Sequence, residues 1–179
     1  MALTNPRSAL TALTQTEHQA VLAALIDAHP NLRNEAEQAA RELLDTVSTN
    51  DVAASVAHAL EEIALDGLGA RVGRIRGRGY VHETEAAWEL VTETIEPFRA
   101  DLTRRANIGL NAAAAALATG IIAGLYMVRR PADGTVLAYT GEDTPEQLAE
   151  EILHLATSLN IELPAHAHKH WPQWDELTG

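Results

Sequence analysis

The sequence predicts an all-α protein, an irregular bundle of about six or seven helices around a buried, Ala/Gly-rich central helix. Apolar residues recur at three- and four-residue spacing through most of the chain, whereas the only stretch that resembles a strand is Val136 to Tyr139. Apolar residues make up 46% of the 179 residues but include only three Trp, three Tyr and one Phe, so Ala, Leu, Val and Ile must build the core. We expect a single domain over residues 1–179, with a short helical-repeat stack as the alternative arrangement.

The first two helices are predicted on either side of Pro30. Thr14 and Glu17 have the spacing of a capping box, which starts a helix that runs to His29. The apolar face of this helix consists of Val21, Leu22, Leu25 and Ile26. The apolar face of the second helix consists of Leu32, Ala36, Ala39, Ala40, Leu43, Leu44 and Val47. Because the connection is so short, we expect the two helices to pack as antiparallel neighbours.

A third helix is predicted to begin at a cap formed by Ser48 or Thr49 and to end at Gly67. Its apolar face consists of Val52, Val56, Leu60, Ile63 and Ala64. Residues 67–83 are rich in Gly and Arg and are expected to form an exposed loop. A fourth helix carries Trp88, Val91, Ile95, Phe98 and Leu102, and we expect Pro97 to kink or break it.

The stretch from Ile108 to Val128 is apolar nearly all round, which predicts a central helix buried on every side. Ala116, Gly120 and Gly124 form a stripe of small residues along it. Such a stripe allows three interpretations: an internal seam, a contact in a homo-oligomer, or a helix pair in a membrane. We do not expect a membrane span, because Ala and Gly are weakly apolar and no other segment has membrane character.

The remaining segments are a short strand-like stretch, a helix and a tail. Val136 to Tyr139 follows an Asp-Gly turn signal and resembles an isolated strand. Thr144 and Pro145 are typical of a helix start, and the apolar pattern then continues to Asn160. Residues 161–179 form a C-terminal segment that contains the remaining His and Trp residues.

The charge of the chain excludes some classes of partner. The formal net charge of −12 repels phosphate backbones and anionic lipid, so we expect no nucleic-acid or membrane binding. There is no Cys, which excludes thiolate metal sites and a Cys nucleophile. Residues 1–13 lack the apolar run of a secretory signal, so we expect a cytoplasmic protein.

The most unusual cluster of side chains is Arg71, Arg74, Arg76 and Arg78, which lie among glycines with no acidic residue between them. The planar guanidinium group suits carboxylate and phosphate, and glycines let a backbone approach a ligand closely. These arginines are therefore candidates for binding an acidic partner or an anion. The alternative is an exposed loop whose arginines only neutralise the acidic helices of the same chain.

His166, His168 and His170 are the second candidate site. Alternate residues of an extended segment point the same way, so the three imidazoles can face one zinc or nickel ion. The alternative is a surface tail with three solvated histidines. Glu151 and His154 match one element of a di-iron bundle, but there is no second copy, and we interpret them as part of a solvated face.

No catalytic motif is present, so nothing in the sequence indicates an enzyme. The pattern predicts a helical protein-interaction module or small adaptor that binds an acidic partner or anion through the Arg/Gly segment. One alternative is a metal-binding protein that uses the three histidines. The other is an acidic helical protein that neutralises a basic partner.

Overall fold

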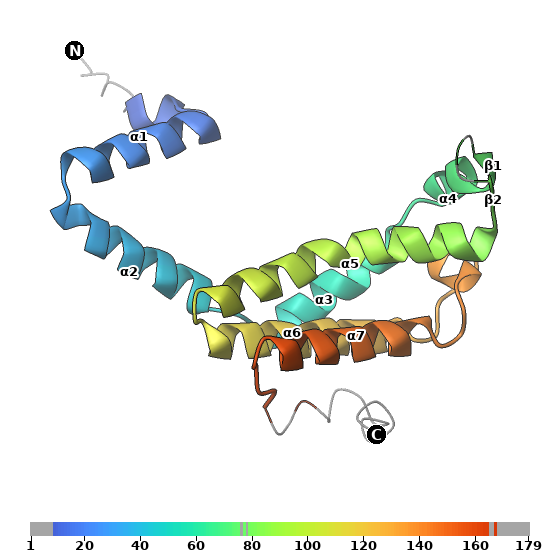
Figure 1. The fold of residues 1–179 in the computed structure, drawn as a ribbon. Helices are drawn as coiled ribbons and strands as arrows, with labels where there is room; N and C mark the ends of the chain where they lie inside the picture. The colour runs from blue at the N-terminus through green and yellow to red at the C-terminus, as the bar shows by residue number, and fades with distance from the viewer. Residues whose placement is uncertain (1–8, 76, 78, 165–166, 168–179) are drawn as a thin grey trace, which may run out of the picture. The chain divides into compact units, whose positions relative to one another are not determined.

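The computed structural model describes residues 9–75, 77, 79–164 and 167 (Figure 1). Over these residues the all-α prediction is confirmed: seven α-helices and two short 3-10 helices accompany a sheet of only two strands. The chain divides into two compact units, Met1–Leu43 and Leu44–Gly179. The single domain expected over residues 1–179 stays a prediction.

The first unit contains the 3-10 helix η1 (Ala9–Ala12), α1 (Gln15–Ala28) and most of α2 (Asn31–Asp45). The predicted capping box is confirmed: the Thr14 hydroxyl accepts from the Glu17 backbone N–H, and the Thr14 N–H donates to the Glu17 carboxylate at 2.8 Å. Neither helix buries a single residue, and Leu22 is 56% exposed. The predicted antiparallel pair is wrong, because α1 and α2 do not pack along their lengths.

The second unit holds the core. Its helices are α3 (Thr49–Glu61), α4 (Leu65–Arg71), α5 (Glu83–Asn107), α6 (Asn111–Met127), the 3-10 helix η2 (Val136–Tyr139) and α7 (Thr144–Ser158). The strands β1 (Gly73–Ile75) and β2 (Gly79–Val81) form an antiparallel hairpin between α4 and α5. Ser48 caps α3 by accepting from the Asp51 N–H, and Pro145 opens α7, both as predicted.

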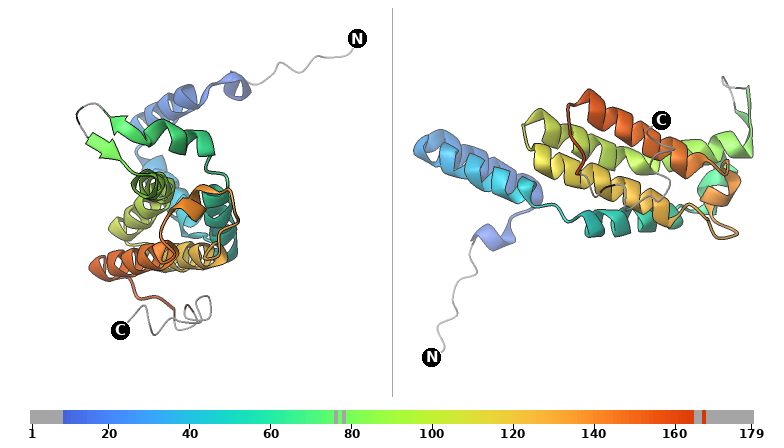
Figure 2. Two further views of the ribbon diagram at one scale, coloured as in Figure 1. Left: turned by 90° about the vertical axis from the view of Figure 1, so that its right-hand side faces the viewer. Right: turned by 90° about the horizontal axis from the view of Figure 1, so that it is seen from below.

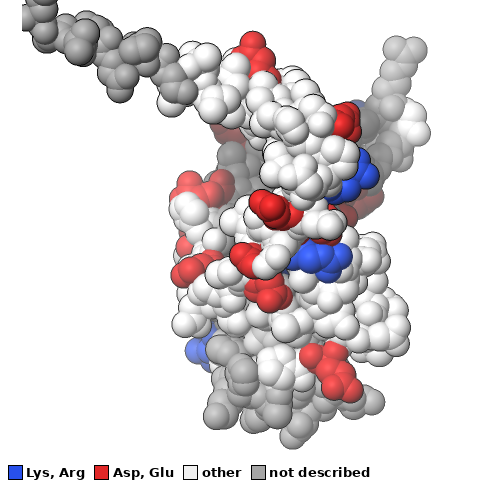
Figure 3. Space-filling model, turned by 90° about the vertical axis from the view of Figure 1, so that its left-hand side faces the viewer, with Lys and Arg blue, Asp and Glu red and all other residues white. Residues whose placement is uncertain are grey.

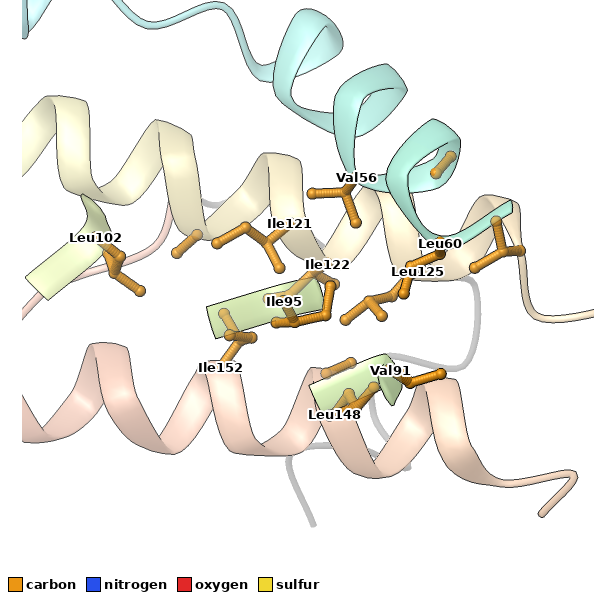
Figure 4. Close-up of a cluster of buried hydrophobic side chains, with 14 of the residues drawn as sticks. Val56, Leu60, Val91, Ile95, Leu102, Ile121, Ile122, Leu125, Leu148 and Ile152 are labelled. Carbon is orange, nitrogen blue, oxygen red and sulfur yellow. The ribbon is translucent and has the colours of Figure 1, made fainter. Parts of the chain in front are cut away.

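The helix α6 lies at the centre of this unit, as the sequence predicts, and contacts α3, α5 and α7. It is buried almost continuously from Ala113 to Leu125. The close-up in Figure 4 shows Ile121, Ile122 and Leu125 surrounded by large side chains from the three neighbouring helices. These neighbours are Val56 and Leu60 of α3, Val91 and Ile95 of α5, and Leu148 and Ile152 of α7, whereas Leu102 of α5 lies apart from them in the same core.

The stripe of small residues on α6 is an internal seam against α3. A Cβ atom added at Gly120 would lie 2.6 Å from the Val52 Cβ, and one added at Gly124 would lie 2.7 Å from the Ala53 carbonyl oxygen. At Ala116 the backbone carbonyl accepts the Thr49 hydroxyl at 3.4 Å. The stripe therefore brings two helices of one chain together. Among the described residues, no helix is both long and apolar enough to cross a membrane.

The expected loop over residues 67–83 is wrong, because this segment forms α4 and the hairpin. The helix α3 ends at Glu61 rather than at Gly67, which lies within α4. Leu68 and Val81 are buried in the core at 5% and 1% exposure. These two apolar residues attach α4 and β2 to the core, which the composition of the segment does not reveal.

Of the kink or break expected at Pro97, the break does not occur, because α5 stays helical from Glu83 to Asn107. The fully buried Ile95 and Leu102 hold the helix on both sides of the proline, and the carbonyl left without a helical N–H belongs to the exposed Glu93. The strand expected at Val136 to Tyr139 is the 3-10 helix η2, in which the adjacent residues Val136 and Leu137 are both buried.

Candidate interaction site at a basic hairpin

The basic hairpin, residues 72–82, stands at one end of the helices of the second unit, beside α4 and the start of α5 (Figure 2). Gly73 pairs with Val81, Arg74 with Tyr80 and Ile75 with Gly79. Val81 anchors the hairpin in the core, whereas Arg74 and Tyr80 lie opposite each other and are both exposed. A cation and an aromatic ring are thus presented side by side.

Glycines are required at three positions of this hairpin. Gly73, Gly77 and Gly79 have φ angles of +106°, +87° and +94°. Residues with a Cβ atom rarely adopt such φ angles. The glycines among the arginines therefore reflect the backbone geometry of a very short hairpin. The glycines shape the turn, and the arginines between them supply the charge.

Arg71 belongs to α4 and not to the hairpin. Its two terminal nitrogens donate to the two carboxylate oxygens of Glu93 in α5, at 2.8 and 2.7 Å. This hydrogen-bonded pair raises the pKa of Arg71 and lowers the pKa of Glu93. The bidentate contact joins α4 to α5 and so supports the base of the hairpin.

Of the other three candidate arginines, the structure describes only Arg74. Arg74 is exposed on β1, whereas Arg76 and Arg78 lie outside the described residues. Next to Arg74, Tyr80 is 63% exposed, and its ring meets the His82 ring edge-on at a centroid distance of 4.9 Å. The structure therefore separates Arg71 from Arg74 and adds Tyr80 and His82, which the sequence did not indicate as site residues.

The proposed metal ligands His166, His168 and His170 also lie outside the described residues. In the part of the chain that the structure describes, no group of three or more His, Cys, Asp or Glu side chains has the geometry to hold a metal ion. His154 is exposed on α7, as expected for a solvated face. Its neighbour Glu151 accepts a hydrogen bond from Arg99 of α5 at 2.7 Å, which joins two helices.

The sequence did not indicate two hollows that meet at Thr140 and Gly141. One has a volume of about 330 Å³ and is bordered by Arg129 and Arg130, just after α6. The other has a volume of about 350 Å³ and is bordered by Trp88 of α5 and Gln147 of α7. Their walls come from segments up to about sixty residues apart, so no local spacing predicts them.

Acidic residues outnumber basic ones in this chain, with 25 Asp and Glu against 13 Lys and Arg. Figure 3 shows them scattered over the face that it draws, with only a few cations among them. This distribution agrees with the net charge of −12 and sets the basic hairpin apart from the rest of the chain.

Three kinds of comparison were made with known proteins. No protein-family model, no curated protein and no solved structure matches this chain.

Proposed function

We propose that the protein is a helical protein-interaction module whose basic hairpin binds an acidic partner or anion. The observation that supports this most directly is the pairing of exposed Arg74 with exposed Tyr80 on an anchored hairpin. Residues 72–82 contain three arginines and no acidic residue, in a chain of net charge −12. Opposite charges steer association and select the partner, so an acidic surface is the natural complement.

In this proposal the four candidate arginines have different roles. Arg71 is committed to Glu93 and acts as a support for the hairpin. Arg74, together with Arg76 and Arg78 in the same segment, is proposed to contact the partner. An exposed Tyr beside Arg is a combination common at the centres of protein interfaces, because a rigid ring adds buried area at low entropic cost.

The open strand edges offer a second kind of contact. A sheet of two strands has one outer edge on each strand, and we propose that backbone N–H and C=O groups there pair with an extended segment of the partner. In this proposal the arginines select an acidic partner, and backbone pairing can add affinity without further sequence preference.

The test is recovery of partners from native lysate with the wild type and two charge-matched variants. The test variant is R74A/R76A/R78A, and the control is R33A/R41A/R104A, which removes the same number of exposed cations from helices. We expect the test variant to lose a partner that the control retains. The test variant should unfold at the wild-type temperature and the control no more than about 4 °C below it, because R104A removes one partner of Asp101. Equal recovery by both variants would contradict the role of the hairpin.

A second candidate function is an acidic helical protein that neutralises a basic partner, which the acidic surface in Figure 3 favours. Its affinity should fall steeply with added salt and should be unaffected by R74A/R76A/R78A. A partner retained by both variants and released by salt would therefore support this function instead. The metal-binding alternative rests on the sequence of His166, His168 and His170 alone.

A further inference from the structure

The hollow of about 330 Å³ beside the end of α6 has the composition of a small-molecule site. Its size lies within the range of roughly 300 to 1,000 Å³ that is typical of ligand pockets. Its lining includes two arginines, Arg129 and Arg130, and the apolar residues Pro131, Leu137 and Pro145. Cationic groups together with apolar surface are the features that bind an organic anion.

The two arginines are unusual because no described carboxylate pairs with them. Every arginine within a described helix forms an ion pair with Asp or Glu: Arg33, Arg41, Arg71, Arg99, Arg104 and Arg105. In a chain with nearly twice as many acidic as basic residues, partners are plentiful. Arg129 and Arg130 nonetheless keep their charge uncompensated within the described residues, at the border of a hollow.

Arg129 is also held in position before any ligand arrives. Its Nη1 donates to the Tyr126 carbonyl at 2.8 Å, and its guanidinium group lies 3.6 Å from the centre of the Tyr126 ring. These contacts use one face and one donor of a group that has five donors. A cation fixed in this way loses little conformational entropy on binding, which favours recognition of an anion.

We propose that this hollow binds a small monocarboxylic acid, independently of the function proposed for the hairpin. Its carboxylate would meet the guanidinium groups of Arg129 and Arg130, and its apolar body would lie against Pro131, Leu137 and Pro145. Glu142 also borders the hollow. Its negative charge disfavours a phosphate dianion more than a singly charged carboxylate, so the carboxylate is the better match.

Benzoate is a suitable probe, with benzyl alcohol and inorganic phosphate as the two comparisons. Binding is followed by the NMR shifts of the Thr140 and Gly141 amides on titration of the full chain. We expect benzoate to cause saturable shifts of these amides. Benzyl alcohol and phosphate should each bind more weakly than benzoate. Two further monocarboxylates, hexanoate and acetate, are titrated in the same way. The proposal would be overturned if none of the three carboxylates gave saturable shifts, or if phosphate bound more tightly than benzoate.

Two variants locate the site. R130A should weaken benzoate binding about tenfold, the usual effect of removing one hydrogen bond to a charged group. G141L is expected to abolish it, because Gly141 borders the hollow and a Cβ there meets only the Thr144 hydroxyl, at 3.8 Å, which leaves room for a bulky side chain to compete with the acid. The matched control is G69L, where a Cβ meets nothing within 4 Å. Equal affinity of G141L and G69L for benzoate would contradict the assignment.

Discussion

The helices α1 and α6 are of similar length and are both rich in Ala and Leu, yet they are stabilised in different ways. The 17-residue α6 is buried from Ala113 to Leu125 with a single half-buried interruption, whereas the 14-residue α1 buries nothing. Contacts that fix α1 and α2 are local, such as the capping box at Thr14 and the hydrogen bonds of Arg41 with Glu37 and of Gln38 with Glu42. Isolated helices of this length are marginal in water.

This difference teaches that helical pattern and helical stability are separate properties of the chain. In the second unit, helices are held by burial of Leu, Ile and Val around α6, and loss of one contact is felt by all of them. In the first unit, exposed Leu22, Leu25 and Leu43 contribute no comparable packing. We therefore expect free energy of unfolding to be concentrated in residues 44–164.

The largest effect is expected at the seam between α6 and α3. G120V should lower the free energy of unfolding by about 3 kcal/mol or more, because even a Cβ there lies 2.6 to 2.8 Å from Val52 and the Thr49 carbonyl. Urea unfolding measures the change. The control G69A should be neutral or should stabilise by up to about 1 kcal/mol, since its Cβ meets nothing within 4 Å. Wild-type stability of G120V would show that the seam is not closely packed.

Truncation of leucines compares the two units directly. L60A removes a fully buried side chain and should cost about 2 to 5 kcal/mol in thermal or urea unfolding. L25A, at a residue that is 46% exposed, should change stability by about 0.5 kcal/mol or less. If the two substitutions cost the same, the contrast between the units does not hold.

The smallest effect on the free energy of unfolding is expected for an ion pair. Burial alone would raise the pKa of Asp101, but hydrogen bonds from Arg104 and Arg105 hold it below its usual value. The carboxylate therefore stabilises the folded state above the pKa of about 4 that Asp has when unfolded, and this contribution disappears as pH falls through the lower folded value. D101N should cost about 1 kcal/mol at pH 7, and this cost should decrease as the pH falls below about 4.

The control for this prediction is E37Q, at an exposed pair with Arg41 within α2. Its cost should stay below about 0.5 kcal/mol at pH 7. A cost for D101N that does not change between pH 7 and pH 2 would assign its effect to packing and not to charge.

The sequence predicted those elements whose signals are local. The capping box at Thr14, the cap at Ser48, the start of α7 at Pro145 and the all-round apolar run of α6 each depend on residues within a few positions of one another. The all-α class follows from these. The role of the small-residue stripe could be assigned only from the structure, because a seam within one chain and a seam between chains require the same residues.

The candidate sites were harder to predict because they depend on contacts between residues that lie far apart in the sequence. Arg71 and Arg74 are three residues apart in sequence, but Arg71 is removed from the set by Glu93, which lies twenty-two positions further on. The strands of the hairpin have three residues each, too few for a period-two pattern to appear. The hollow beside Arg129 depends on how α6, η2 and α7 meet, which is a tertiary property.

Native-state hydrogen exchange followed residue by residue tests the contrast between the units most directly. Amides of residues 21–26 in α1 should exchange at least roughly a hundredfold faster than those of residues 121–125 in α6, because α1 opens locally whereas α6 opens only with the whole core. Equal protection of the two segments would contradict the account, since it would mean that α1 shares the stability of a buried core.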